Sequence, residues 1–143
     1  QWTDNENAGF TDGTPWLAMN PNYRQINVRE QEARTDSVLA YYRRLVHLRK
    51  ADAYRETFTY GIFEPAYQEM ADVFAYYRVS GESGQRILVA ANFGTDAVSL
   101  PLAYPCRQVL LSNLRAESAV ETACEKANAL TLESCEVAVI ELG

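Results

Sequence analysis

Apolar residues recur at three- and four-residue steps between Asp36 and Lys50, a spacing that places them on one side of an α-helix. This apolar stripe consists of Val38, Tyr41, Tyr42, Leu45 and Leu48. Basic side chains crowd the second half of the segment, where the negative end of a helix dipole favours them. Asp36 or Thr35 is the expected N-cap residue. The pattern therefore predicts one long helix over about 36–50.

From Arg55 onward the apolar residues follow a two-residue period, which is typical of strands. A first strand over 57–63 would place Phe58, Tyr60 and Ile62 on one face, with Gly61 at a bulge or a close contact. The further expected strands are 72–79, 86–93, 97–100, 108–112, 130–132 and 135–142. Because 86–93 contains a continuous apolar run, we expect it to be central, and the glycine-containing turn before it predicts a hairpin with 72–79.

The segment 116–128 has two interpretations. Its Ala, Glu and Lys content favours a helix. Its position between strands favours an irregular connection, which is the interpretation we adopt. Short strands with frequent turns then predict a mainly β fold, most simply an antiparallel β-sandwich.

The first 28 residues, QWTDNENAGFTDGTPWLAMNPNYRQINV, are too rich in Asn, Gly, Pro and Asp for a long regular element. They nevertheless carry four large aromatic side chains, Trp2, Phe10, Trp16 and Tyr23. Chain termini are usually polar and poorly ordered, so this segment is better explained as an ordered loop on a rigid scaffold. We therefore expect the chain to be a piece of something larger.

The motifs QWTD, NAGF, TPW and NPNYRQINV resemble the late catalytic-domain loop of the α-glucosidase branch of the α-amylase superfamily, glycoside hydrolase family 13. That branch includes oligo-1,6-glucosidases, trehalose-6-phosphate hydrolases and sucrose isomerases. The resemblance continues through DSVLAYYRRLVHLRK, similar to the last helix of the barrel, and through VFAYYR and ILVAANF. Thr3 departs from the usual acid after QW, whereas Asp4 keeps the second acid.

The resemblance implies a division of the chain into two parts. Residues 1–52 would be the tail of a catalytic (β/α)8 barrel, a loop plus its last helix. Residues 53–143 would be the family's C-terminal domain, a Greek-key β-sandwich. The parent would hydrolyse α-glucosidic bonds, α-1,6 bonds in particular, with retention. The catalytic carboxylates of such enzymes lie on earlier barrel strands, so this chain would itself be stabilising and hold no catalytic residue.

The composition limits the classes of molecule that we expect this chain to bind. The 143 residues carry a formal net charge of −6 and are 48% hydrophobic, which argues against a nucleic-acid or anionic-membrane partner. One histidine and three cysteines without metal-ligand spacing predict no metal site and no cofactor. Free thiols suit a reducing compartment, so we expect a cytoplasmic protein with three free cysteines. The expected partners are the remaining barrel, oligosaccharide only through that parent, and a second copy if the chain is isolated.

Three residues are candidates for substrate binding, namely Trp2, Asp4 and Trp16. Flat aromatic faces beside polar groups suit sugar rings. The alternative is that these aromatic residues only fasten the loop to the barrel. A different class of function also stays open, an autonomous carbohydrate-binding module, which would need exposed aromatic residues on one face of the sandwich. The candidates there are Phe58, Tyr60, Tyr76 and Tyr77.

Overall fold

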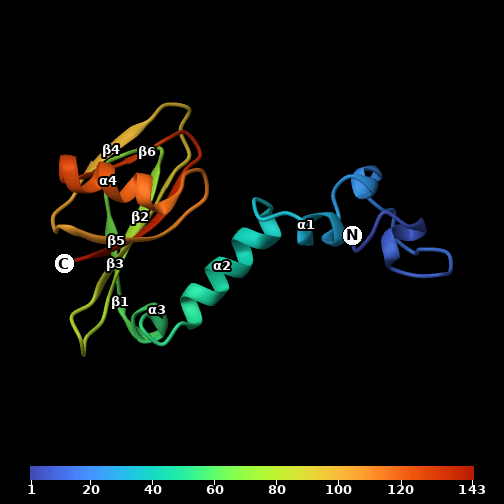
Figure 1. Cartoon of the computed structure of the whole chain (residues 1–143), viewed down its shortest axis with the longest axis horizontal. Helices are drawn as coiled ribbons and strands as arrows, with labels where there is room; N and C mark the ends of the chain where they lie inside the picture. Colours follow the sequence, from blue (N-terminus) through green and yellow to red (C-terminus); the bar gives the residue numbers. More distant parts are fainter. The chain divides into compact units, whose positions relative to one another are not determined.

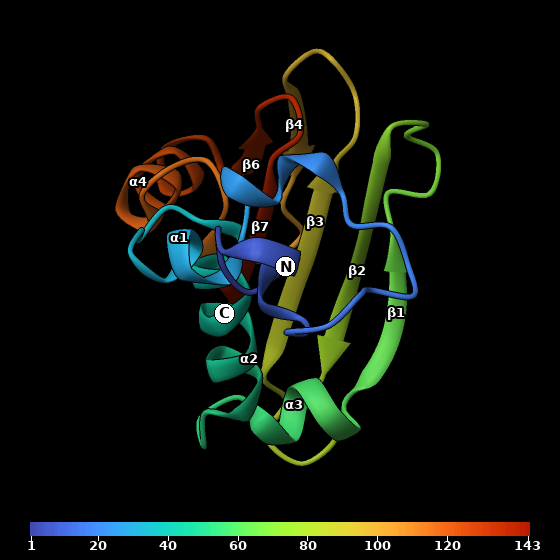
Figure 2. The same cartoon turned by 90° about the vertical axis from the view of Figure 1, so that its right-hand side faces the viewer.

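The computed structural model describes the backbone of residues 1–143 and every side chain outside residues 122–123 and 125–127. The chain forms two compact units, Gln1–Val46 and His47–Gly143. Helix α2, Val38–Lys50, contains the division between them. Helices α1–α4 and strands β1–β6 are labelled in Figure 1, and β7 is labelled in Figure 2. The proposed domain limit after residue 52 concerns the parent protein and stays a prediction.

The first unit begins, as predicted, without a long regular element. It contains two short 3-10 segments, η1 (Glu6–Gly9) and η2 (Pro21–Arg24), followed by the short helix α1 (Val28–Glu32). Asn27 begins α1 as its N-cap, because its side chain accepts a hydrogen bond from the Glu30 N–H at 3.0 Å. Asn20 does the same for η2 by accepting from the Asn22 N–H.

The predicted long helix is confirmed as α2, but the expected N-cap is wrong. Ser37 caps the helix, since its Oγ accepts a hydrogen bond from the Ala40 N–H at 3.1 Å and donates to the Gln31 carbonyl at 2.7 Å. Asp36 is instead paired with Arg34 at 3.0 Å. No side chain of α2 is fully buried, and 77% of Val38 is exposed. The apolar stripe of this helix therefore stays largely uncovered.

The second unit is built around a five-stranded antiparallel sheet in the order β1-β2-β3-β7-β5. A separate pair, β4 and β6, accompanies it. The elements in chain order are α3 (Arg55–Tyr60), β1 (Ile62–Ala66), β2 (Val73–Val79), β3 (Arg86–Asn92), β4 (Val98–Pro101), β5 (Cys106–Ser112), α4 (Glu117–Ala127), β6 (Ala129–Leu132) and β7 (Val137–Leu142). Strands β1, β2 and β3 lie side by side in Figure 2. The central position of 86–93 and its hairpin with 72–79 are both confirmed.

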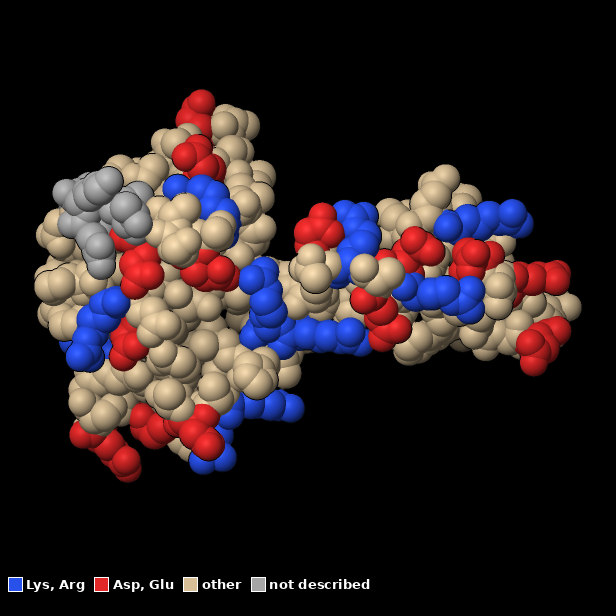
Figure 3. Space-filling view, in the orientation of Figure 1, with Lys and Arg blue, Asp and Glu red and all other residues tan. Residues whose placement is uncertain are grey.

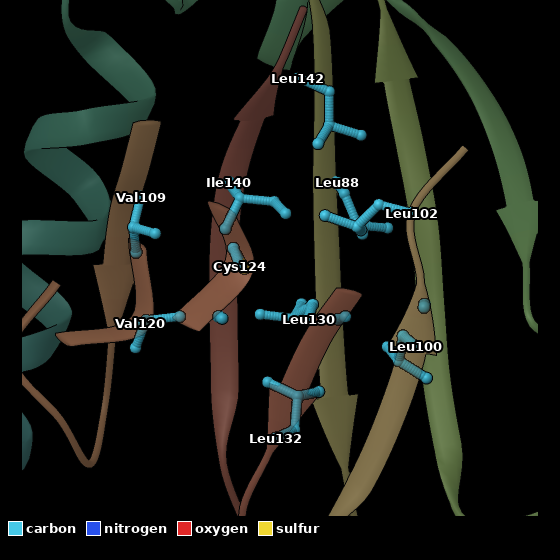
Figure 4. Close-up of a cluster of buried hydrophobic side chains, with 13 residues drawn as sticks. Leu88, Leu100, Leu102, Val109, Val120, Cys124, Leu130, Leu132, Ile140 and Leu142 are labelled. Atoms are coloured by element: carbon cyan, nitrogen blue, oxygen red, sulfur yellow. The ribbon is translucent and has the colours of Figure 1, made fainter. Parts of the chain in front are cut away.

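One face of the large sheet carries the core. The sheet contributes Leu88, Val109 and Ile140, while β4, β6 and α4 contribute the opposing side chains in Figure 4, namely Leu100, Leu130, Leu132, Val120 and Cys124. The residues of this cluster are at most 6% exposed. The mainly β, antiparallel sandwich class is thus confirmed, with α4 completing the thinner second layer.

Two predicted segments are wrong. Residues 55–60 form helix α3 rather than part of a strand, and β1 begins only at Ile62. Gly61 ends that helix at a close contact, where an added Cβ would meet the carbonyl oxygens of Thr57 and Val79. The segment 116–128 is helical over Glu117–Ala127 rather than irregular. Val120 and Cys124 lie one helical turn apart on it, so both can face the core.

A buried carboxylate fastens the strand entering β7 to its surroundings. Glu136 is fully buried and accepts hydrogen bonds from Arg115, from Ser112 Oγ at 2.9 Å and from the Glu133 N–H at 2.8 Å. Arg115 binds both carboxylate oxygens, at 2.9 and 2.7 Å, and donates to the Thr131 carbonyl at 2.7 Å. Burial alone would raise the carboxyl pKa of Glu136. The hydrogen bonds outweigh it and hold this pKa below its ordinary value.

Each edge strand of the large sheet carries a distinct feature. Edge strand β1 contains Pro65, which lies opposite Tyr76 of β2. At the other edge, β5 pairs with β7 through two register shifts, between Cys106 and Gln108 and between Val109 and Leu111. Elsewhere, acidic and basic side chains are interspersed over the face shown in Figure 3.

Candidate functional site

A groove of about 520 Å³ lies in the first unit, lined by Gln1, by residues 10–11 and by the segment 15–20 that begins at the first proline. Its lining is mainly apolar: Gln1, Phe10, Thr11, Pro15, Trp16, Leu17, Ala18, Met19 and Asn20. Trp16 is 91% exposed and Leu17 is 61% exposed. Large apolar side chains this exposed are available for contact with a surface outside the described chain.

Tight backbone turns directly precede the groove residues Phe10 and Thr11 along the chain. Asn7, Ala8 and Gly9 all adopt positive φ angles, of 57°, 53° and 74°. The Asn7 side chain holds the following turn by donating to the carbonyls of Thr11 and Gly13, at 3.0 and 2.9 Å. The Ala8 carbonyl accepts from the Trp2 N–H at 2.9 Å. The short-range motifs of the sequence therefore close the loop upon itself.

Of the three sequence-predicted candidates, only Trp16 lines the groove. Asp4 is committed to an ion pair with Arg29, with 2.7 Å between Oδ1 and Nη1. The Trp2 carbonyl accepts from the Arg29 N–H at 3.1 Å, and 56% of the Trp2 residue is exposed. Trp2 and Asp4 are thus both tied to the start of helix α1. Their substrate-binding role stays a prediction.

The groove also contains polar groups that the sequence did not single out. The Gln1 side chain donates to the Asn22 side chain at 3.2 Å and to the Ile26 carbonyl. Asn20 Oδ1 accepts from the backbone of η2 at 3.1 Å. An indole face beside amide groups can stack on the C–H face of a sugar and hydrogen-bond its hydroxyls. The signal that could have identified Asn20 is its cap position directly before Pro21.

A second group of exposed aromatic residues lies on β1 and β2, on the sheet face opposite the core. The rings of Phe63 and Tyr76 are 4.8 Å apart with an interplanar angle of 31°, and Phe74 meets Tyr76 edge-on at 5.7 Å. Phe63 and Phe74 are 50% and 55% exposed. With Arg49, Phe58, Thr59 and Arg78 they border a hollow of about 520 Å³. We call these three rings the aromatic platform.

Two arginines hold their guanidinium groups beside the platform. Arg78 donates to the Phe58 carbonyl at 3.3 Å, and Arg49 donates to the same carbonyl at 3.2 Å. Of the residues suggested from sequence for such a surface, Tyr76 belongs to the platform and Phe58 borders its hollow. Tyr77 instead packs against the core cluster on the other face. The sequence missed Phe63, because it placed that residue in a strand beginning at 57.

Metal-binding clusters, membrane-spanning helices and cysteine pairing were considered for the described residues. Among them, no group of three His, Cys, Asp or Glu side chains is placed to hold a metal ion. None of the described helices has the length and apolar character needed to cross a membrane. All three cysteines are free thiols.

Comparisons with known proteins place these features in one family. Residues 1–61 match the family described as "Alpha amylase, catalytic domain". The chain is 36% identical over 125 residues to an oligo-1,6-glucosidase of Parageobacillus thermoglucosidasius, an alignment covering 85% of this chain and 21% of the relative. It is 37% identical over 121 residues to a glucan 1,6-α-glucosidase of Streptococcus pneumoniae, covering 85% and 22%. The chain thus spans about a fifth of these curated relatives.

Solved structures agree. An isomaltulose synthase from a Klebsiella species superposes with a TM-score of 0.85 at 32% identity, covering 100% of this chain and 24% of that one. A trehalulose synthase of Pseudomonas mesoacidophila gives a TM-score of 0.82 at 29% identity, with coverage of 100% and 24%. Sequence motifs, fold and relatives thus agree that this chain is homologous to a part of enzymes of the α-amylase family, glycoside hydrolase family 13.

Proposed function

We propose that this chain is the C-terminal part of an α-glucosidase, which hydrolyses α-glucosidic bonds, α-1,6 bonds among them, with retention. The observation that carries the proposal is the match of residues 1–61 to the catalytic domain in a chain spanning about a fifth of its glucosidase relatives. We further propose that residues 1–52 complete the barrel and that residues 53–143 form a stabilising, non-catalytic domain.

Retention requires a nucleophile and an acid/base carboxyl group about 5–5.5 Å apart across the scissile bond. Asp4 is occupied by Arg29, and Glu136 is occupied by Arg115. Glu64 is paired with Arg86 at 3.4 Å on the exposed β1 edge. These three carboxylates are engaged in ion pairs, which supports the proposal that the catalytic carboxylates lie in the rest of the parent protein.

The test is release of 4-nitrophenol from its α-glucoside by the purified 143-residue chain, beside an Asp4→Ala/Glu64→Ala variant. We expect neither protein to exceed the buffer rate, since loss of the catalytic carboxylates removes several orders of magnitude of rate. Turnover that follows the chain through purification, and that the double variant loses, would refute the non-catalytic proposal.

The partner we propose is the remaining barrel, and the uncovered stripe of α2 supports it. Val38 and Tyr42 are 77% and 63% exposed, and an exposed apolar stripe favours burial against another surface. We propose that in the cell oligosaccharide reaches the chain only as part of that parent, in a reducing cytoplasm suited to its free thiols. Without the barrel, the same stripe would pair two copies. Light scattering should then report mass increasing with concentration, and Val38→Glu/Tyr42→Glu should keep the chain monomeric.

The domain limit after residue 52 also has a direct test. Residues 51–54 lie between helices α2 and α3, and Asp52 is almost fully exposed in its weak pair with Arg55. Limited proteolysis should cut there first and leave a folded fragment beginning near residue 53. A first cut inside β1–β7 would contradict the proposed limit.

For substrate contact, we propose that Trp16 stacks on an oligosaccharide of the parent, while Asp4 and Trp2 orient the loop that carries it. Both tryptophans lie in the first unit, so Trp2→Phe leaves Trp16 as the one tryptophan, whose emission can be excited apart from that of the tyrosines. Isomalto-oligosaccharide added to this variant should change its emission at millimolar concentration. An unchanged spectrum, together with a normal circular dichroism spectrum, would contradict direct contact.

The aromatic platform favours a second candidate function, an autonomous carbohydrate-binding module. Exposed rings in mutual contact, beside a hollow that two arginines also line, resemble the surfaces on which sugar rings are held. Heteronuclear NMR titration with isomaltotriose would move resonances around Phe74 and Tyr76 if this function holds. Phe74→Ala should abolish those shifts, with Phe93→Ala as a control because Phe93 is also exposed, at 72%, but does not border the hollow.

A further inference from the structure

The hollow beside the aromatic platform carries positive charge without negative charge. Among the described residues that line it, Arg49 and Arg78 are basic and none is acidic. The lining is completed by Phe58, Thr59, Phe63, Phe74 and Tyr76, all of them in the second unit. Within the part of the chain whose side chains are described, neither arginine is paired with a carboxylate. The hollow is therefore a cationic spot on a chain whose formal net charge is −6.

Backbone carbonyl groups fix both guanidinium groups in place. Arg78 donates from Nε to the Thr57 carbonyl at 3.4 Å. Its Nη2 donates to the carbonyls of Phe58 and Thr59, at 3.3 and 3.4 Å. Arg49 donates from Nη1 to the same Phe58 carbonyl at 3.2 Å. Because the two arginines share one acceptor in the last turn of α3, their charges lie close together, and the negative end of the helix offsets them only in part.

Each guanidinium group keeps donors for a ligand. Of its five N–H donors, the two on Nη1 of Arg78 have no acceptor in the described part of the chain, and neither do those on Nε and Nη2 of Arg49. Arg49 is exposed and Arg78 is half-buried, so both can be reached from solvent. A planar guanidinium group matches the oxygen spacing of a carboxylate or a phosphate group.

The rings supply the other half of the site. Phe63 and Phe74 are 50% and 55% exposed, and Tyr76 is in ring contact with both. Exposed rings offer an apolar face on which the C–H groups of a sugar ring can pack. The hollow of about 520 Å³ has the size of a small-molecule site, which leaves room for one sugar ring and a charged substituent.

We propose that this hollow binds an acidic carbohydrate, a pyranose ring that carries a phosphate or carboxylate group. The ring packs on the aromatic platform, and the anionic group binds Arg49 and Arg78. This inference rests on the second candidate function, carbohydrate binding by the platform, and it names the class of sugar. A neutral sugar leaves both positive charges without a counter-charge, so it should bind more weakly.

The experiment is a heteronuclear NMR titration of the 143-residue chain with glucose 6-phosphate, glucuronate, methyl α-glucoside and inorganic phosphate. We expect both acidic sugars to shift resonances of Phe74, Tyr76 and Arg78, and to bind about tenfold more tightly than methyl α-glucoside. Inorganic phosphate should bind more weakly than glucose 6-phosphate and leave Phe74 unmoved, because it has no ring. Added salt should weaken the binding of the acidic sugars and spare that of the neutral one.

Matched variants separate the charge of the hollow from the charge of the whole chain. Arg49→Gln should weaken the binding of glucose 6-phosphate about tenfold. Arg49 gives one hydrogen bond to the described chain, whereas Arg78 holds three carbonyls, so Arg49 can be replaced with less risk to the fold. The control is Arg107→Gln on β5, at the opposite edge of the sheet from β1, which should change the affinity by less than about twofold. Circular dichroism checks that both variants are folded.

The outcomes separate this inference from the function on which it rests. Equal affinity for methyl α-glucoside and glucose 6-phosphate would overturn the acidic ligand and leave carbohydrate binding by the platform standing. No shift with any sugar, isomaltotriose included, would overturn both. Equal binding of inorganic phosphate and glucose 6-phosphate, with the rings unmoved, would overturn the proposal in favour of an adventitious ion only. Unchanged affinity in folded Arg49→Gln would also overturn it.

Discussion

Replacing Glu136 by Gln should remove one of the strongest polar attachments in the second unit. The carboxylate is fully buried and accepts four hydrogen bonds, two of them from Arg115. A Gln side chain keeps the shape but replaces one carboxylate oxygen by an NH2 group. This group would then face the donors that the oxygen accepts from in the wild type. It also leaves the Arg115 guanidinium without its counter-charge.

The expected loss follows from these contacts. Hydrogen bonds to a charged group contribute about 1.5–3 kcal/mol each, and breaking a buried pair by removing one partner costs about 3–5 kcal/mol. Arg115 is 26% exposed, so water partly solvates it once its partner is lost. We therefore expect Glu136→Gln to lower the free energy of unfolding by about 3 kcal/mol.

Urea unfolding followed by far-ultraviolet circular dichroism measures this loss. The matched control is Glu133→Gln, the same substitution three residues away at an exposed position, with an expected change within about 0.5 kcal/mol. Equal stabilities of the two variants at pH 7 would refute the structural role given to the buried pair.

The same pair predicts a pH dependence. The folded-state pKa of Glu136 is lowered from the ordinary value of 4.5, so its contribution to stability is present above that pH. It is lost as pH falls through the still lower folded-state pKa. The stability difference between the wild type and Glu136→Gln should therefore shrink below about pH 4.5. A difference that stays constant to pH 3 would contradict the assignment of charge to this carboxyl group.

Three further substitutions test local features by the same urea assay. Gly61→Ala should cost about 1–3 kcal/mol, because its Cβ would meet two carbonyl oxygens, whereas Gly81→Ala meets nothing within 4 Å and should be nearly neutral. Asn92→Ala should cost about 2 kcal/mol, since Asn92 is 2% exposed and its amide serves three backbone carbonyls. Ser37→Ala removes the α2 cap and should cost about 1 kcal/mol. Losses below about 0.5 kcal/mol at Gly61, Asn92 and Ser37 would contradict these three explanations in turn.

The hydrophobic pattern correctly predicted those strands whose burial is indicated by their own sequence. The run 86–93 is apolar on both faces, and the structure places β3 between β2 and β7. Helix α2 likewise followed from its periodicity. The local pattern gave a wrong prediction where contacts with distant residues determine the secondary structure. Residues 57–60 alternate as a strand would, yet Thr57 is buried in helix α3 and Arg78 binds the carbonyls of that segment.

The candidate site was only partly predictable for a related reason. Composition could indicate that aromatic residues gather near the start of the chain, but not which of them face outward. Trp16 lines the groove, whereas Asp4 is committed to Arg29, a residue 25 positions away. Pairing across such a distance leaves no periodic signal in the sequence. The aromatic platform was missed similarly, because it depends on the register between β1 and β2.

The features of the two sheet edges have a consequence for aggregation. An open edge strand can recruit a strand of another molecule, and such growth leads to amyloid-like assemblies. Pro65 has no N–H to offer a newcomer at the β1 edge, and the register shifts of β5 interrupt the regular ladder at the other edge. Copies of this chain brought together at high concentration should therefore associate through side chains and remain dispersible, rather than polymerise by strand addition.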